Sequence, residues 1–466
     1  MTQLRMWCAL LCLFSAGCTV GPNYQRPKVN PPPVFRAQPQ GSSPQPSTAS
    51  LGNEKWWEVF QDRVLQQLIR TALDQNYDVR IAATRVLQAQ AELGITRAGQ
   101  FPTVASGAQA YSQRNPKIAA TFPSYEANAA EVDLSLLWNL DFWGKYRRQT
   151  EAARDNLLAT EWGRQAVITS LVSTVATDYF QLRELDLALE ISQHTLASRQ
   201  DSLRLTRVLA VNGSASLLDL RQAEELVYTA AQQVPDLERQ IQQQENAISD
   251  LLGANPGPVA RGLKLTEQPL PAAVPVGLPS ELLDRRPDIR EAEANLMAAN
   301  ADIGVARAAF FPNIALTGTA GFESYALSRL FTGSAGLWNT AASLTQPVFA
   351  AGAIRSGMRL ARAQEEQLLL TYKQTIIGAF QQVSDALIAD QKDREFREQQ
   401  ERLTSATADA DRLSKILYQH GGASYLQVLT SETNYFAAQL NLAQAQLNER
   451  LALVQLYNAL GGGWQH

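Results

Sequence analysis

The chain has 466 residues, with 41 Lys or Arg and 45 Asp or Glu, and its formal net charge at pH 7 is −4. These charges form no basic stripe, so the composition argues against a nucleic-acid partner. The three histidines are scattered, and the HExxH, P-loop and GxSxG motifs are lacking. The sequence therefore argues against a hydrolase, a kinase or a metalloenzyme and predicts no cofactor or metal site.

Residues 1–17 are predicted to be a lipoprotein signal peptide. Arg5 gives a positive start, an apolar stretch follows, and small residues precede Cys18, the predicted acylated first residue of the mature chain. Ser15 stands where such signals usually have an aliphatic residue, but the alternative, an uncleaved transmembrane helix, has too few apolar residues to span hydrocarbon. Thr19 permits export to the outer membrane. The mature chain keeps no second cysteine and therefore no disulfide.

Residues 18–50 are rich in Pro, Ser and Gln. Such a composition buries little apolar surface, so this segment is predicted to lie extended as a tether between the lipid and the body of the protein.

The remaining sequence is predicted to be a tandem repeat, with repeat 1 at 51–260 and repeat 2 at 261–466. Asp78-Val79-Arg80 recurs as Asp288-Ile289-Arg290 at an offset of about 210. The matched positions include Gly94 with Gly304 and, at an offset of about 208, Gly144 with Gly352. A duplication of this length predicts a pseudo-symmetric structure whose function depends on the walls that the two repeats form together.

Each repeat is predicted to contain a helix, two strands, a very long helix, a tight turn and a return helix. From Lys145 to Asn212 there is no proline and only one glycine, and leucines recur at spacings of three, four and seven, as in a coiled-coil seam. That helix would be about 100 Å long, and the return helix Ser214 to Leu252 about 58 Å. The opening helices, 77–99 and 288–310, supply about 35 Å more. Such lengths predict a tube or a strut, with the Pro-rich and Gly-rich connector after Gly253 lying part-way along it as a belt.

Four strands are predicted, at about 102–112, 128–143, 312–323 and 337–349. In the second of them Leu134, Leu136 and Trp138 share one face, and mainly polar residues share the other. Alternation alone also fits a soluble hairpin packed on a helix. Strand lengths near ten residues and aromatic residues at the strand ends, such as Trp143 and Phe311, favour transmembrane strands.

Four strands cannot close a barrel by themselves. An open strand edge in lipid leaves backbone groups unsatisfied, at a cost of several kcal/mol each. The barrel must therefore be shared between chains, and the sequence predicts an oligomeric α+β membrane protein.

Three segments carry a family resemblance: Cys18-Thr-Val-Gly-Pro-Asn-Tyr24, Trp56-Trp57-Glu-Val-Phe-Gln-Asp62, and the block Arg285-Arg286-Pro287-Asp288. They resemble the TolC-like outer-membrane efflux proteins, and within these the NodT and OprM type of lipoprotein. The resemblance implies a homotrimer with a 12-stranded β-barrel, four strands per chain, continued by an α-helical coiled-coil tunnel in the periplasm. It also implies a periplasmic adaptor (membrane fusion) protein and an inner-membrane transporter of the RND or ABC type as partners, besides outer-membrane lipid. The implied function is a passive duct that exports drugs or other small molecules from a Gram-negative cell.

The Arg-Arg-Pro-Asp block also has a local explanation. Pro287 and Asp288 suit the first turn of a helix, and Asn76 with Asp78 can cap the equivalent helix in the first repeat. We expect these residues to begin helices rather than to contact substrate.

Two helix-breaking turns, at 212–216 and 420–424, face the same way by the repeat symmetry. The resemblance implies that they are hairpin tips at the periplasmic mouth, where small residues allow close contact with the adaptor and glycine allows a tight turn. Turn chemistry alone favours an ordinary hairpin turn. The candidate adaptor contacts are Gly213, Ser214, Ala215, Ser216, Gly421, Gly422, Ala423 and Ser424.

Asp219 and Tyr418 match the carboxylate and the tyrosine that are linked at the family's closed mouth. We expect Tyr418 to donate a hydrogen bond to Asp219, worth about 1 to 3 kcal/mol because the acceptor is charged. Gln427 and Thr430 stand where TolC has aspartates, and the nearest acid is Glu432.

The gate therefore departs from the family pattern. Ala423 stands where TolC has an arginine, so we expect closure to use other contacts, with Arg207 and Lys415 as candidates. A solvent-exposed helix face is the alternative role for Glu432.

Two other functions remain open. A type I protein-secretion duct would share the fold. A coiled-coil scaffold lipoprotein would explain the helices and the anchor, but it leaves four alternating strands with aromatic ends unexplained.

Overall fold

The computed structural model describes residues 19–36, 50–114, 126–269, 271, 275 and 277–464. The predicted signal peptide and Cys18 lie outside these residues, as does much of the predicted tether. Over these residues the chain is mostly helical and contains one four-stranded sheet. It divides into two compact units, which do not follow the predicted repeat boundaries, because each unit draws on both halves of the chain. Unit 1 comprises residues 1–28, 85–161 and 291–373, and unit 2 comprises 29–84, 162–290 and 374–466.

The main helices occur in pairs of equal length, one member from each half of the sequence. The pairs are α4 (Tyr77–Ala98) and α8 (Pro287–Ala308) with 22 residues each, α5 (Lys145–Val211) and α9 (Ala353–Gln419) with 67, and α6 (Leu217–Leu251) and α10 (Tyr425–Ala459) with 35. Shorter helices are α2 (Trp56–Val59), α3 (Arg63–Gln75) and α7 (Leu282–Arg285). Leu171, Val175 and Leu182 of the predicted leucine seam are buried.

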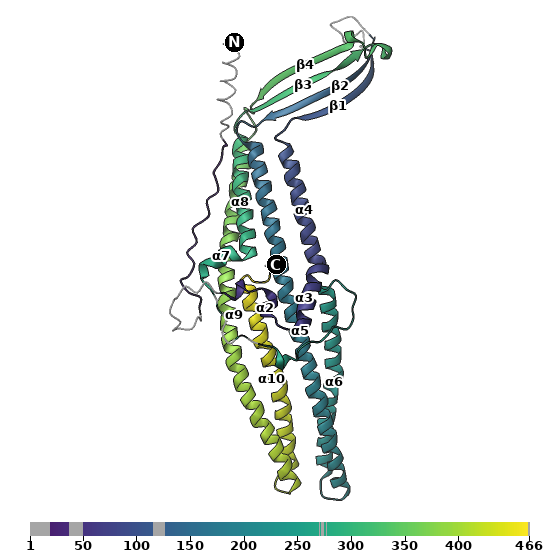
Figure 1. Cartoon of the computed structure of the whole chain (residues 1–466), viewed down its shortest axis with the longest axis vertical. Coiled ribbons are helices and arrows are strands. Elements are labelled where there is room, and N and C mark those ends of the chain that lie inside the picture. Colours follow the sequence, from purple (N-terminus) through teal and green to yellow (C-terminus); the bar gives the residue numbers. More distant parts are fainter. Residues whose placement is uncertain are drawn as a thin grey trace. The chain divides into compact units, whose positions relative to one another are not determined.

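The sheet belongs to unit 1 and is antiparallel throughout, in the order β1-β2-β3-β4 (Figure 1). Its strands are β1 (Thr103–Arg114), β2 (Glu126–Leu140), β3 (Asn313–Ser324) and β4 (Gly336–Thr345). The register places Val132 of β2 opposite Phe322 of β3. Within the part of the chain that the structure describes, β1 and β4 each pair on one side only, so the sheet has two open edges.

Two strands end earlier than predicted. β2 stops at Leu140 because the carboxylate of Asp141 accepts hydrogen bonds from the backbone N–H groups of Tyr146 and Arg147, at 3.1 and 2.9 Å, and so caps the start of α5. β4 stops at Thr345 because Pro347, two residues later, has no N–H to continue the ladder.

Equivalent contacts fix the start of α4 and of α8 in unit 2. Asn76 accepts hydrogen bonds from two backbone N–H groups of α4, and its amide nitrogen donates to the carbonyl of Leu251 at the end of α6, at 3.0 Å. Arg286 pairs with Asp288 and donates to the carbonyl of Ala459 at the end of α10, at 2.9 Å. The helix-starting role predicted for both segments is confirmed, and each also satisfies a terminal carbonyl of a return helix.

A buried carboxylate holds the connector between the two halves. Asp62 accepts hydrogen bonds from the backbone N–H groups of Val64 and Leu263, the hydroxyl of Tyr179 and the amide of Gln268, all within 2.8 to 2.9 Å. Burial acts to raise the pKa of Asp62, but these hydrogen bonds outweigh burial and lower it. An ionised Asp62 therefore ties the start of α3 and the middle of α5 to the connector.

Candidate functional site: the helical hairpin tips

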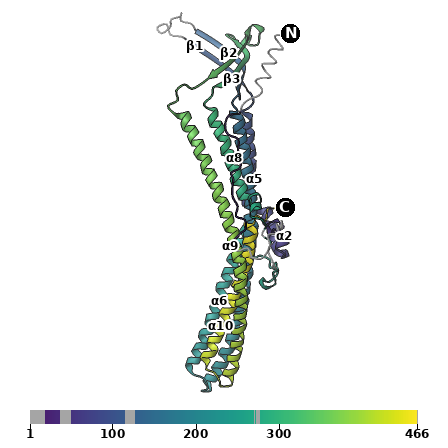
Figure 2. The same cartoon turned by 90° about the vertical axis from the view of Figure 1, so that its left-hand side faces the viewer.

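The two hairpin turns close in the same way. The helix pairs α5–α6 and α9–α10 are joined by turns in which Gly213 and Gly421 adopt φ angles of 75° and 78°. Just after each glycine, a backbone N–H donates to a carbonyl of the last helical turn, from Ser214 to Leu209 and from Gly422 to Leu417, both at 2.8 Å. Beyond these turns, the return helices α6 and α10 contact each other (Figure 2).

The return helices begin differently. Ser216 and Asp219 form a capping box at the start of α6, with the two reciprocal hydrogen bonds at 3.1 and 2.9 Å. Ser424 occupies the same position before α10 but makes no side-chain capping hydrogen bond. Most of the candidate adaptor contacts are exposed, namely Gly213, Ser214, Ser216, Gly421, Gly422 and Ser424, while Ala215 and Ala423 are half-buried.

The predicted hydrogen bond from Tyr418 to Asp219 does not occur among the described contacts. Asp219 uses its carboxylate for the capping box, and the ring of Tyr418 lies 5.5 Å from that of Tyr425. The pKa of Tyr418 is raised, mainly by burial and to a smaller extent by the negative charge of Asp219. The two predicted gate residues are therefore electrostatically coupled, but they are not linked by a hydrogen bond in this conformation.

Glu432 is not on a solvent-exposed face, so that alternative is wrong. It is 6% exposed, and its carboxylate lies 2.9 Å from the ammonium of Lys415 on α9. Ser202 of α5 donates a hydrogen bond to the same carboxylate at 3.4 Å. Lys415 also pairs with Asp411 at 2.9 Å. Glu432 of α10 therefore contacts α9 through Lys415 and α5 through Ser202.

The charges of this cluster support one another. Burial acts to lower the pKa of Lys415, but Glu432 and Asp411 raise it overall, so its ammonium stays charged. The second candidate cation, Arg207, is exposed and lies 3.6 Å from Glu224. Of the two candidates, Lys415 is therefore the one that pairs with buried carboxylates.

Two further residues of this region were not predicted from the sequence. Arg199 of α5 is buried, donates to the carbonyl of Leu226 at 2.9 Å and lies 5.1 Å from the ring centre of Phe436. Asp411 precedes Lys415 by one helical turn, and that spacing was the available signal. Nothing in the sequence marked Arg199.

Gln427 and Thr430 lie on another face of α10 from Glu432. Both are exposed and line an open groove of about 420 Å³ together with Ala423. A separate cavity of about 70 Å³ lies between the hairpins, with a mixed polar and apolar lining. It is lined by Ser202, Leu205, Thr206, Lys415, Tyr418, Gln419, Tyr425 and Val428. Of the predicted gate residues, Gln427 and Thr430 therefore line the open groove, Tyr418 lines the cavity between the hairpins, and Glu432 is buried.

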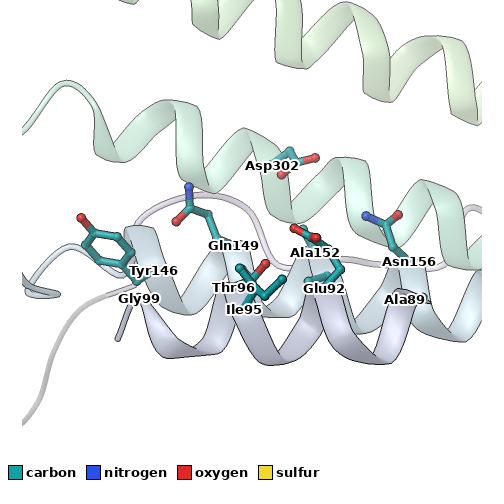
Figure 3. Close-up of a pocket in the computed structure, with 11 residues that line it drawn as sticks. Ala89, Glu92, Ile95, Thr96, Gly99, Tyr146, Gln149, Ala152, Asn156 and Asp302 are labelled. Atoms are coloured by element: carbon teal, nitrogen blue, oxygen red, sulfur yellow. The ribbon is translucent and has the colours of Figure 1, made fainter. Parts of the chain in front are cut away.

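Unit 1 contains a larger groove, of about 500 Å³, between α4, α5 and α8 (Figure 3). Glu92 of α4 and Asp302 of α8 contribute carboxylates, and Gln149 and Asn156 of α5 contribute amides. In the described ranges, no cluster of three or more potential metal ligands occurs. None of the helices described here is both long enough and apolar enough to span a bilayer.

A model of the family described as "Outer membrane efflux protein" matches residues 68–254 and 278–462. This chain belongs to the outer membrane efflux protein family. The efflux pump outer membrane protein TtgC of Pseudomonas putida is 36% identical over 470 residues, covering 100% of this chain and 96% of TtgC. The cation efflux system protein CusC of Escherichia coli K12 is 34% identical over 463 residues and covers 99% of both chains.

Solved structures of outer-membrane channels agree with this membership. The channel OprN superposes with a TM-score of 0.88 at 31% identity, covering 96% of this chain and 100% of OprN. The open state of the MtrE channel of Neisseria gonorrhoeae gives 0.87 at 32% identity, covering 96% and 99%. This member of the outer membrane efflux protein family is therefore an outer-membrane efflux component with the channel fold.

Proposed function

We propose that this protein is the passive, gated outer-membrane duct of a tripartite efflux pump. Three copies close a 12-stranded barrel, and their helices form the periplasmic tunnel. The four-stranded sheet with two open edges carries this proposal, because in a membrane each edge must find a partner strand. The equal lengths of the paired helices support the tandem repeat and a pseudo-symmetric tunnel wall.

The lipid anchor is proposed at Cys18, at the predicted start of the mature chain. The duct is proposed to bind no cofactor and to catalyse no reaction, since it only encloses the channel through which the exported molecule passes. The helical hairpin turns at 212–216 and 420–424 are the proposed adaptor contacts, and their exposed small residues suit close packing with another hairpin.

The proposed gate comprises Asp219, Tyr418, Gln427, Thr430 and Glu432. Its closing contact is the buried cluster in which Glu432 pairs with Lys415, in place of the family's arginine at the tip. Glu432 and Lys415 belong to the same hairpin, and Ser202 of α5 links the other hairpin to Glu432 by a hydrogen bond. Adaptor binding at the tips opens the mouth by breaking this link and separating the hairpins. A hydrogen bond to a charged group contributes about 1.5 to 3 kcal/mol, which is within the reach of an adaptor interface.

The proposed partners are a periplasmic adaptor and an inner-membrane transporter of the RND or ABC type. Relatives of similar identity are described as a toluene efflux pump component and as a cation efflux component. Because related ducts serve such different cargo, we assign the substrate class as drugs or other small molecules, set by the transporter rather than by the duct.

The test uses Gram-negative cells that lack their own outer-membrane efflux channels. They would express this chain with the adaptor and transporter encoded beside it, and accumulation of a fluorescent dye would be measured. We expect lower dye accumulation than in the same cells after the transporter has been inactivated by ATP depletion or by a proton uncoupler. Unchanged accumulation together with export of a large polypeptide would instead favour the type I secretion duct.

A further inference from the structure

The first turns of α9 carry three arginines on one face, Arg355, Arg359 and Arg362, here called the arginine stripe. Their spacings of four and three residues place them within about 60° of one another around the helix. All three are exposed, and within the part of the chain that the structure describes none of them makes an ion pair. Between Glu323 and Glu365 the sequence contains four arginines and no Asp or Glu. The stripe is therefore a local excess of positive charge in unit 1.

The equivalent turns of α5 show that the repeated helix does not require such a stripe. The equivalent positions hold Arg147, Glu151 and Arg154, so both signs of charge occur there. Arg147 pairs with Asp141 at 3.2 Å, and Glu151 pairs with Arg148 at 2.8 Å. Like charges three or four residues apart on a helix repel each other, so the stripe of α9 is unfavourable without an anion against it.

Two exposed apolar residues lie between the sheet and the stripe. β4 ends at Thr345, and Val348 and Phe349, which follow it, are 98% and 88% exposed. Apolar surface of this kind is unfavourable in water and is accepted by hydrocarbon. Apolar side chains followed by cations are the arrangement that surfaces in contact with a lipid interface use.

The stripe lies on the face of its helix that points away from the groove side. Gln149 and Asn156 of α5 line the groove of unit 1 (Figure 3), and the equivalent residues of α9 are Gly357 and Gln364. At about 100° per residue, these two lie about 180 to 200° around the helix from Arg355. The wall of a duct is hollow toward its path, so the stripe faces outward. This step rests on the proposed function.

We propose that the arginine stripe binds the phosphates of anionic phospholipids, such as phosphatidylglycerol, in the membrane leaflet that adjoins the helices. Val348 and Phe349 contact the acyl chains of the same lipids. A guanidinium group matches a phosphate with two parallel hydrogen bonds. From Arg355 to Arg362 the stripe extends about 10 Å along the helix, and long arginine side chains can bring their charged ends to one headgroup layer.

Lipid binding by the full-length protein in detergent tests the stripe. Native mass spectrometry would follow titrations with phosphatidylglycerol and with phosphatidylethanolamine of the same acyl chains, which has no net charge. We expect the native protein to prefer phosphatidylglycerol. The triple variant Arg355→Gln, Arg359→Gln and Arg362→Gln should bind this lipid about tenfold more weakly or worse. A native protein without the preference, or a triple variant that keeps it, overturns the proposal.

The matched control removes three exposed cations from the part of α9 that belongs to unit 2. Lys392→Gln, Arg402→Gln and Arg412→Gln change the net charge by the same amount and should leave the preference as in the native protein. Equal losses in the control and in the stripe variant would mean that net charge, rather than the stripe, attracts the lipid, and would overturn the proposal.

Two further variants separate the charge from the apolar contact. Lysine at all three stripe positions keeps the charge and should keep most of the preference, whereas a loss as complete as with glutamine would contradict an electrostatic contact. Val348→Ser with Phe349→Ser should weaken the binding of both lipids equally, because acyl chains do not distinguish the headgroups. Unchanged binding of both lipids would contradict the assigned acyl-chain contact.

Size-exclusion chromatography of the glutamine variant distinguishes lipid from a second copy of the chain. Dissociation of its assembly would place another copy against the stripe and overturn the lipid surface, whereas an unchanged assembly supports it. The duct and the lipid surface can also fail separately. A protein that conducts normally without a lipid preference overturns only the lipid surface, and one that shows the preference but never conducts contradicts only the duct.

Discussion

The two halves of this chain show how one repeated backbone can acquire two sets of contacts. Gly304 and Gly94 occupy equivalent helix positions, and so do Gly144 and Gly352 just before the long helices. Of these four positions only two are covered, Gly304 by the side chain of Arg148 and Gly144 by Thr19. The comparison teaches that the duplicated sequence specifies the helices, while a few charged side chains decide what lies against them.

The largest expected effect comes from the helix junctions. Arg286→Met should lower the free energy of unfolding by about 2 to 3 kcal/mol, because it leaves the buried terminal carbonyl of Ala459 without its charged donor. Asn76→Ala, at the equivalent junction, should cost about 1 kcal/mol, the usual value of a helix cap. Thermal unfolding in detergent followed by circular dichroism measures both. Equal losses would mean that the charge at Arg286 adds nothing to the cap.

The glycine pair should give changes of opposite sign. Gly304→Ala should destabilise by about 1 to 2 kcal/mol, because its Cβ would lie 2.8 Å from the side chain of Arg148. Gly94→Ala should stabilise by about 0.5 to 1 kcal/mol, since alanine is the better helix former and the site is open. The same thermal unfolding experiment measures both changes, and it is done on dissociated chains and on the assembled protein for comparison. Destabilisation by Gly94→Ala only in the assembled protein would place a second copy against α4.

The hairpin caps should differ least. Ser216→Ala removes a capping box and should cost about 1 kcal/mol, whereas Ser424→Ala removes no side-chain cap and should cost a few tenths. Hydrogen exchange in the first turns of α6 and α10 reports each change locally. An equal increase in exchange at both sites would contradict the predicted difference between the two helix caps.

The elements that follow from local chemistry were predictable. Helix lengths followed from the absence of proline between Lys145 and Asn212, and the strands followed from the alternation around Leu134. The end of β2 was missed because the capping role of Asp141 depends on where α5 begins. Each of these is a short-range property of the chain.

The site residues were harder to predict, because their roles depend on contacts distant in sequence. Glu432 is buried where Ser202 of α5 and Lys415 of α9 approach it. Residues 19–26 follow no secondary-structure pattern, and their contacts with Arg148 and Glu293 are visible only in the fold. Sequence patterns identify the surfaces of single elements, but they do not show which surfaces meet.

Single-channel conductance of the purified protein in planar bilayers tests the gated duct most directly. We predict low conductance for the native protein and higher conductance for Lys415→Met, which removes the partner of a buried Glu432. Lys392→Met, which changes an exposed lysine of the same helix, should conduct like the native protein. A native protein that never conducts would contradict the duct, and a Lys415→Met channel no more open than the native one would contradict the proposed gate.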